Sequence, residues 1–234
     1  MSSPVIELDK VEFSWQAGQP VLDIPALRIM AGERVFLKGP SGSGKSSLLN
    51  LISGIQTPLA GEVRLLGEVI NHYGNVWRDC FRADHIGLIF QQFNLLPYLS
   101  VKENVILPCH FSQQRRQRSI DRYGSPEAAA LQLLSHLGMA SNMLLTRSVN
   151  ELSIGQQQRV AAARALIGSP ELVIADEPTS ALDTDMRSVF IRLLIQECEQ
   201  AGSTLVFVSH DETLVDHFSR QILLSDINKA VLPS

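Results

Sequence analysis

The sequence has no long hydrophobic run and no apolar segment at its start. No stretch of about 18 apolar residues occurs, so we expect that the chain does not cross a bilayer by itself. The first ten residues include acidic ones and lack the apolar segment of a secretory signal. If the protein serves a membrane process, we expect another polypeptide to supply the membrane part.

Cysteine and positive charge are also scarce. The three cysteines, Cys80, Cys109 and Cys198, are widely spaced and form no CxxC pair, which is typical of a reduced cytosolic protein. Lys and Arg total 20 against 24 Asp and Glu, giving a formal net charge of -4. Non-specific nucleic-acid binding depends on clustered Lys and Arg, so we expect no nucleic-acid partner.

What the sequence does contain is material for one large α/β domain. Hydrophobic residues make up 45% of the 234 residues, enough for a sizeable core. Short apolar runs alternate with helical patterns, which predicts a mostly parallel sheet covered on both faces. The N-terminal strands predict a small flanking antiparallel sheet. Predicted strands cover residues 5–13, 22–29, 34–38, 61–66, 86–90, 172–175 and 204–209, and predicted helices cover 46–52, 155–167 and 185–200.

A helical stretch interrupts this alternation at about residues 92–155. We interpret it as a subdomain inserted into a core made of residues 1–91 and 156–234. Within it, residues 112–124 hold four arginines among polar residues and are interpreted as a solvated loop or helix connection, with a binding patch as the alternative. Ser125 and Pro126 predict a helix start, with Ser as N-cap and Pro in the first turn.

Residues 39–46 form a phosphate-binding motif. They fit GxxxxGK[ST] without a gap, between an apolar strand and a helix. Glycines let backbone N–H groups surround phosphate oxygens, and the helix adds its N-terminal dipole. The Lys45 ammonium can reach the β- and γ-phosphates, and the Ser46 hydroxyl can ligate Mg²⁺. The motif predicts a nucleoside triphosphate site but does not separate kinases, GTPases, motors and transporters. Its predicted nucleotide-binding residues are Gly39, Pro40, Ser41, Gly42, Ser43, Gly44, Lys45, Ser46 and Ser47.

Two carboxylates, Asp176 and Glu177, follow the apolar strand predicted at residues 172–175. Ligands of parallel sheets lie at the carboxyl ends of the strands, so both side chains are expected beside the phosphate-binding motif. There Asp176 can hold Mg²⁺ through water, and Glu177 can polarise the attacking water as a general base, worth roughly 10² to 10⁴ in rate. The alternative is an ordinary acidic cap of the next loop.

Residues 152–159 read LSIGQQQR and resemble the LSGGQ signature of the ATP-binding-cassette (ABC) ATPases. Gln156 lies 20 positions before Asp176, as in that family. Other family elements follow in order, and the resemblance covers nearly the whole chain. They are Trp15 as the aromatic that stacks on adenine, Gln91 as the Q-loop glutamine, residues 180–183 as the D-loop with Asp183, and His210 as the switch histidine.

The resemblance implies a P-loop ATPase that works as a head-to-tail homodimer. Each ATP would lie between the phosphate loop of one copy and the signature of the other, so ATP closes the dimer and hydrolysis opens it. In this arrangement the signature and D-loop contributions come from Ser153, Gly155, Gln156 and Asp183. The implied catalytic residues are Glu177, His210 and Gln91, and the implied Mg²⁺ ligands are Ser46, Gln91 and Asp176.

Several of these assignments have alternatives in the sequence itself. Trp15 is alternatively a core residue, His210 a structural histidine, and Gln92 the ligand in place of its neighbour Gln91. The signature departs from the family in having Ile154 where glycine is usual, which leaves the hydrolysis rate and the dimer affinity open.

The segments 89–97 and 101–105 are similar to the ATPases of the lipoprotein-release, macrolide-export and cell-division group. That group works with an integral membrane permease, which implies a peripheral location on the cytoplasmic face of the inner membrane. The alternatives are an importer-type ABC ATPase, a non-transport ABC ATPase of DNA repair or translation, and a small-molecule kinase that shares only the phosphate loop.

Overall fold

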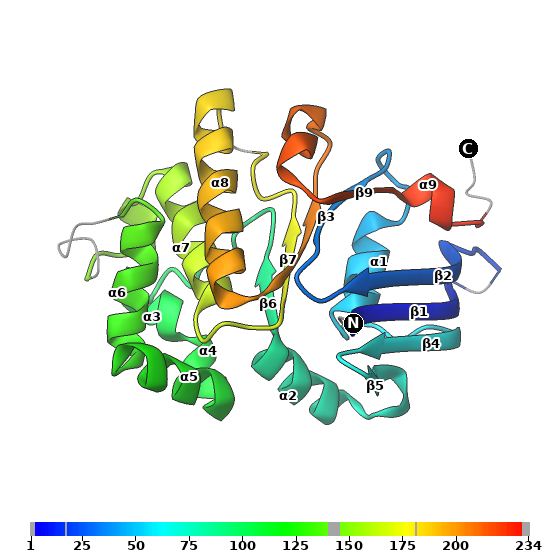
Figure 1. The fold of residues 1–234 in the computed structure, drawn as a ribbon, viewed down its shortest axis with the longest axis horizontal. Helices are drawn as coiled ribbons and strands as arrows, with labels where there is room; N and C mark the ends of the chain where they lie inside the picture. Colours follow the sequence, from blue (N-terminus) through cyan, green and yellow to red (C-terminus); the bar gives the residue numbers. More distant parts are fainter. Residues whose placement is uncertain (1–2, 17, 140–145, 181, 231–234) are drawn as a thin grey trace.

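The computed structural model describes residues 3–16, 18–139, 146–180 and 182–230. It has two sheets, with helices between and around them (Figure 1). Figure 1 shows the parallel sheet in the middle, the antiparallel sheet on one side and helices α3 to α6 on the other. The predicted fold class, a P-loop core with a flanking antiparallel sheet and inserted helices, is confirmed.

The central sheet has the strand order β6-β7-β8-β3-β9, and all its pairs are parallel. The inner strands are buried on both faces, which is why they read as continuous apolar runs. The edge strand β9 differs, because its Arg220 and Gln221 are exposed. β3, for example, is fully apolar between its terminal Arg34 and Lys38. The strands are β3 (Arg34–Lys38), β6 (Ile86–Ile89), β7 (Leu172–Asp176), β8 (Thr204–Val208) and β9 (Arg220–Leu223).

The second sheet has the order β2-β1-β4-β5 and is antiparallel throughout. Its long central strand β1 buries alternate side chains such as Ile6 and Leu8, the pattern of a sheet with one face on the core. The strands are β1 (Pro4–Phe13), β2 (Leu22–Met30), β4 (Ala60–Leu65) and β5 (Glu68–Val69).

Helix α1 (Lys45–Ile52) lies between the two sheets. Its buried Leu48 and Leu51 belong to a cluster that includes Ile6 of β1 and Val35 of β3. The helix is thus packed on both sides, which fixes the position of its N-terminus relative to the carboxyl ends of β3 and β7.

The opposite face of the parallel sheet is covered by other helices. Phe36 of β3 and Phe207 of β8 turn to this side and pack with Val160 and Leu194 of the covering helices. The helices on this side are α3 (Val101–Ile106), α4 (Pro108–Phe111), α5 (Gln113–Tyr123), α6 (Pro126–His136), α7 (Ile154–Leu166) and α8 (Thr184–Ala201). Two further helices, α2 (Asn75–His85) and α9 (Leu224–Ile227), pack against the cluster that contains α1, and 3-10 turns lie at Ile70–His72, Val149–Glu151 and Glu212–His217.

Two expectations for the helical stretch have different outcomes. The helix start at Ser125 is confirmed: its Oγ accepts a hydrogen bond from the backbone N–H of Ala128 at 3.1 Å, and Pro126 is in the first turn. The solvated interpretation of residues 112–124 is wrong for Arg115, which is only 2% exposed on α5. Its guanidinium donates to the carbonyls of Ala165 and Ile167 and ties α5 to the end of α7, because those carbonyls lack helical partners there.

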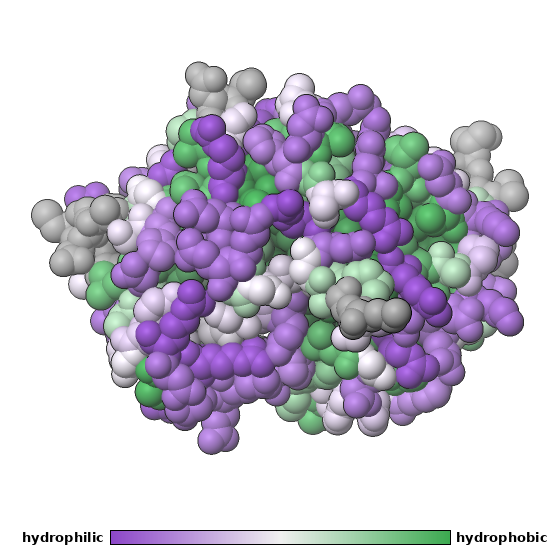
Figure 2. Space-filling view, viewed as in Figure 1, coloured by the Kyte–Doolittle hydropathy of each residue, from purple (hydrophilic) through white to green (hydrophobic). Residues whose placement is uncertain are grey.

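The predicted subdomain boundary between residues 155 and 156 stays a prediction. It falls inside α7, which is continuous from Ile154 to Leu166. Figure 2 shows hydrophilic residues over most of the viewed face, with hydrophobic ones visible between them. Among the residues described, no helix combines the length and the apolar character that a bilayer span requires.

Candidate functional site: the phosphate loop and its surroundings

The loop of residues 39–46 joins β3 to α1. Gly44 occupies the N-cap of α1 with a φ of 99°, a conformation that side chains other than glycine rarely adopt. A Cβ at this residue would also lie 2.9 Å from Cδ2 of Leu22. Glycine is therefore required here, and the loop leads directly into the first turn of α1, whose N–H groups lack helical partners.

The side chain of Lys45 folds back over the loop. Its Nζ donates hydrogen bonds to the carbonyl oxygens of Gly39 at 2.7 Å and Pro40 at 2.8 Å. Burial lowers the pKa of the Lys45 ammonium, while the carboxylates of Glu177 and Asp176 act in the opposite direction. The loop thus places one cation beside two acids at the end of the parallel sheet.

The two acids lie where the strand pattern predicts them. Asp176 is the last residue of β7, and burial raises its pKa against the attraction of Lys45 and His210. Burial likewise raises the pKa of Glu177, with His210 opposing the shift most strongly. Buried carboxylates near a cation are common among groups that exchange protons during catalysis.

Glu177 has an unusual backbone. Its φ is 46°, in the left-handed region, and its N–H donates to the carbonyl of Val208 on β8 at 3.0 Å. Such strain is typical of functional positions. Its Oε1 lies 3.0 Å from Nε2 of His210, but this ion-pair contact lacks hydrogen-bond geometry, so among the described residues the buried Oε1 has no hydrogen-bond donor. The carboxylate therefore keeps a buried accepting position that no described residue fills.

Gln91 lies two residues after the end of β6 and is exposed beside Lys45 and the two acids. It lines the phosphate-loop hollow described below, whereas Gln92 does not, so the structure favours Gln91 over its neighbour. The turn after it is fixed by a residue that the sequence analysis missed. Arg164 of α7 donates to the carbonyls of Phe93 at 2.6 Å and Asn94 at 2.7 Å. A single arginine within a helical pattern gives no sequence signal for this role.

These side chains surround one depression of about 440 Å³, called here the phosphate-loop hollow. Gly39, Pro40 and Ser43 belong to the loop but do not line it. Trp15 does line it and is 57% exposed, so the alternative of a core tryptophan is wrong. The lining residues are Trp15, Val21, Ser41, Gly42, Gly44, Lys45, Ser46, Ser47, Gln91, Asp176, Glu177 and His210.

The predicted signature residues do not reach the hollow of their own chain. Ser153 is the N-cap of α7: its Oγ accepts from the N–H of Gln156, and Oε1 of Gln156 accepts from the N–H of Ser153 at 3.0 Å. This capping box satisfies two N–H groups at the helix start. Both Ser153 and Ile154 are exposed, the latter by 53%, so the start of α7 faces away from the chain.

The predicted D-loop lies against the signature. A Cβ at Gly155 would lie 3.0 Å from Cε of Met186 and 3.6 Å from Cδ2 of Leu182, so a glycine permits this close approach. Asp183 caps α8 by accepting a hydrogen bond from the N–H of Met186 at 2.9 Å. Ala181, also in the predicted D-loop, lies outside the described residues.

A second arginine missed by the sequence analysis links the D-loop to the switch histidine. Arg187 of α8 donates to the carbonyl of Leu182 at 2.7 Å and forms an ion pair with Asp211 at 2.8 Å. Since Asp211 follows His210, this arginine fixes the loop that carries the histidine relative to the start of α8.

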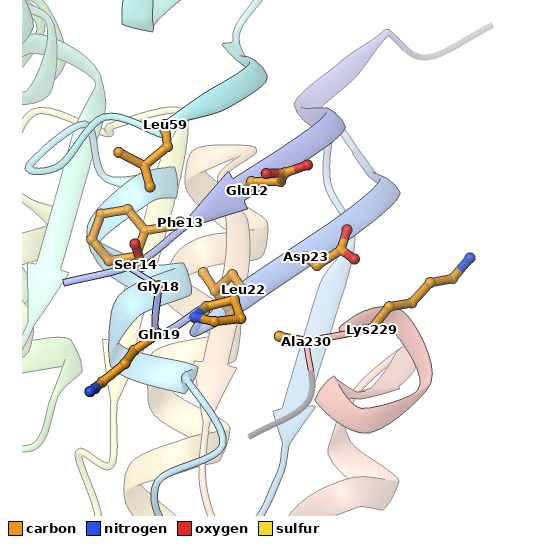
Figure 3. Close-up of a pocket in the computed structure, with 11 residues that line it drawn as sticks. Glu12, Phe13, Ser14, Gly18, Gln19, Leu22, Asp23, Leu59, Lys229 and Ala230 are labelled. Atoms are coloured by element: carbon orange, nitrogen blue, oxygen red, sulfur yellow. The ribbon is translucent and has the colours of Figure 1, made fainter. Parts of the chain in front are cut away.

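A further hollow of about 470 Å³ lies on the N-terminal β-hairpin (Figure 3). Phe13, Leu22 and Leu59 line it, with Glu12 and Asp23 at its edge, and none of its lining residues lines the phosphate-loop hollow. We therefore treat it as separate from the candidate site.

Comparisons with known proteins agree with this geometry. Residues 22–180 match the family described as ABC transporter. The uncharacterized ABC transporter ATP-binding protein YknY of Bacillus subtilis is 39% identical over 230 residues, which are 96% of this chain and 94% of the relative. The macrolide export ATP-binding/permease protein MacB of Burkholderia thailandensis is 38% identical over 97% of this chain but only 34% of its own length, so this chain spans about a third of that relative.

Solved structures are similar over nearly the whole chain. The dimeric structure of MJ0796, a bacterial ABC transporter cassette, has a TM-score of 0.80 and 36% identity, covering 93% of each chain. A dimeric post-hydrolysis state of the same cassette, bound to ADP and Pi, also has a TM-score of 0.80, with 34% identity over 98% of this chain and 97% of that one. The chain therefore belongs to the ABC transporter family, as an ATP-binding and ATP-hydrolysing subunit.

Proposed function

We propose that the phosphate-loop hollow binds ATP with Mg²⁺ and hydrolyses it. The observation that carries this proposal is that Lys45, Gln91, Asp176, Glu177 and His210, which come from separate parts of the sequence, line one depression. Backbone N–H groups of the loop and the Lys45 ammonium supply positive charge for the phosphates.

The residues present fit a magnesium ion. Ser46, Gln91 and Asp176 line the same hollow and offer hydroxyl, amide and carboxylate oxygens, the donors that Mg²⁺ prefers. When bound, the ion supplies charge that neutralises the phosphates. The chain's own contribution is to orient these oxygens at the adjacent ends of α1, β6 and β7.

Glu177 is the proposed general base. Its raised pKa and free Oε1 suit it to accept a proton from water. His210 lies against the same carboxylate and can orient it while contacting the terminal phosphate. The strained backbone at Glu177 keeps this geometry fixed.

We further propose that the complete site forms between two copies. The hollow of the same chain is not lined by Ser153, Gly155, Gln156 or Asp183. The start of α7, where Ser153 and Ile154 are exposed, offers a positive helix end to another molecule. A second copy arranged head to tail would bring these groups to the terminal phosphate. The dimeric structures of the similar cassette MJ0796 support this arrangement.

The dimer would drive an integral membrane permease of the lipoprotein-release or macrolide-export type from the cytoplasmic face of the inner membrane. The relative MacB, whose name joins ATP-binding and permease functions, supports this subgroup. In this chain the permease part would come from another polypeptide. Co-purification with a native membrane protein, identified by mass spectrometry, tests the partner.

The site itself is tested by Glu177→Gln. Loss of the general base should lower ATP turnover by roughly 10² to 10⁴ while ATP binding persists and a closed dimer accumulates. Turnover by a phosphate-release assay and mass by sedimentation with Mg-ATP are the measurements. Turnover equal to that of the unaltered protein would exclude Glu177 as the base.

A further inference from the structure

The ring of Trp15 is fixed at two points although 57% of the residue is exposed. Its edge packs against Phe13, with ring centroids 5.0 Å apart and planes at 86°. Its Nε1–H donates a hydrogen bond to Oγ of Ser47 at 3.0 Å. Figure 3 shows the Phe13 ring at the neighbouring hairpin hollow. The indole is therefore a positioned surface that faces the phosphate-loop hollow.

The partner of the indole N–H has a particular location. Ser47 is 6% exposed and lies in the first turn of α1, two residues after Lys45. An indole can only donate a hydrogen bond, and the hydroxyl of Ser47 accepts it. This single bond connects the hairpin that carries Trp15 to the helix that begins at the phosphate loop.

We propose that Ser47 is a positioning residue for the nucleobase: its hydroxyl fixes the indole of Trp15 and, through it, the base relative to the phosphate loop. The inference rests on the proposed nucleotide site. A ring that is already oriented loses less freedom when a base stacks on it, so binding is tighter. Ser47 then affects the base end of the ligand, although it lies beside the phosphate end.

The consequence separates two functions of one hydroxyl. If Ser47 acts through Trp15, its hydroxyl strengthens binding of ATP more than binding of inorganic tripolyphosphate, which has no base. If the hydroxyl acts only on the phosphates, both ligands depend on it equally. The base-dependent part of its effect exists only while an indole N–H is present, because phenylalanine cannot donate the bond.

The experiment measures ATP and tripolyphosphate affinity by calorimetry, with Mg²⁺, for the unaltered full chain, Ser47→Ala, Trp15→Phe and the double variant. We expect Ser47→Ala to weaken ATP binding about two- to tenfold, the range of one neutral hydrogen bond. Tripolyphosphate affinity should fall less than ATP affinity, and the effect of Ser47→Ala on ATP affinity should be smaller in the Trp15→Phe background. An equal loss for both ligands, or the same Ser47→Ala effect in both backgrounds, would overturn the inference.

Trp77 provides the matched control. It stacks on Tyr73 and Phe81 along α2, and it lines no part of the hollow. Trp77→Phe should leave ATP affinity unchanged and leave Trp15 as the only indole. In that background, Ser47→Ala should shift the Trp15 emission without nucleotide; an identical spectrum would contradict the bond. Failure of the unaltered chain to bind ATP would overturn the nucleotide site, and this inference with it, whereas the tripolyphosphate comparison overturns the inference alone.

Discussion

The phosphate-loop side and the signature side of this molecule are built in different ways. The first side brings together Lys45 of the loop, Asp176 and Glu177 at the end of β7, and His210 after β8. Within one chain, Glu177 contacts His210, and these charged groups affect the pKa of Lys45 and of Glu177. On the second side, Ser153 and Ile154 are exposed, and the hydrogen bonds of Ser153 are made within the first turn of its own helix. The first side is assembled within one chain, and we propose that the second is completed by a partner chain.

This difference predicts that single substitutions separate ligand binding from pairing. A change on the phosphate-loop side should alter the isolated chain. A change on the signature side should alter only what two chains do together. The following tests run from the largest expected effect to the smallest.

Lys45→Ala should weaken ATP binding by the isolated chain about 10- to 100-fold, because it removes a charged hydrogen-bond donor to the phosphates. Calorimetry measures the affinity. Lys102→Ala, in α3, removes a lysine that does not line the hollow and should leave the affinity unchanged. Unchanged affinity in Lys45→Ala would contradict the assignment of the phosphate loop.

Ser153→Ala should weaken ATP-dependent pairing by at least about tenfold, the scale of a hydrogen bond to a charged group, with little change in the ATP affinity of the single chain. Sedimentation in the Glu177→Gln background measures pairing. Ser125→Ala is a matched control, since Ser125 caps α6 in the same way. Both variants should lose about 1 kcal/mol of stability, but only Ser153→Ala should lose pairing; equal pairing in the two would refute the role of the signature.

The pH profile of hydrolysis should follow Glu177. The base must be ionised, so the rate should fall as the pH falls through the raised pKa of Glu177. Where His210 is protonated it lowers that pKa, so His210→Ala should move the acid limb of the profile to higher pH, whatever it does to the maximal rate. His110→Ala is the control, because His110 is exposed on α4 and does not line the hollow. An acid limb that moves to lower pH would contradict this electrostatic relation.

The smallest effect on stability is expected at Glu171, which immediately precedes β7 and belongs to neither of these two sides. Burial alone would raise the pKa of Glu171, but hydrogen bonds from His85 and Arg118 outweigh it and lower the pKa to about 2. Because the folded-state pKa is depressed, this contribution is present above the ordinary value of 4.5 and is lost as the pH falls toward 2.

Glu171→Gln should therefore cost about 1 kcal/mol at neutral pH, discounted for partial exposure, and the deficit should shrink with acidification through that window. Urea unfolding at several pH values measures it. A deficit that is independent of pH would show that the charge of Glu171 is not responsible.

The sequence predicted the parts of the site whose shape is local. The strand–loop–helix at residues 34–52, the acidic end of β7 and the capped start of α7 each depend on neighbours in the chain. The strand pattern also predicted both sheets apart from β5 and β9, because burial on two faces or on one leaves different apolar periodicities.

What escaped prediction depends on contacts far apart in the sequence. Arg115 was interpreted as solvated, and no role was predicted for Arg164 or Arg187, yet each donates to backbone carbonyls. The carbonyls that Arg115 and Arg164 contact lie at least 50 residues away. Helix α2 was missed altogether; its aromatic side chains Trp77 and Phe81 are separated by polar residues, and ring stacking between them appears only once the helix exists. No local sequence pattern indicates which backbone carbonyl an arginine side chain will contact.

Because α7 is one continuous helix, it connects two distant parts of the molecule. Near one end, Arg164 is hydrogen-bonded to the turn after Gln91, and Ser153 lies at the other end. At 1.5 Å per residue the two ends are roughly 16 Å apart, so a tilt of about 5° at the arginine displaces the serine by about 1.4 Å. A small movement of the turn after Gln91, passed to α7 through Arg164, would therefore displace the exposed start of this helix.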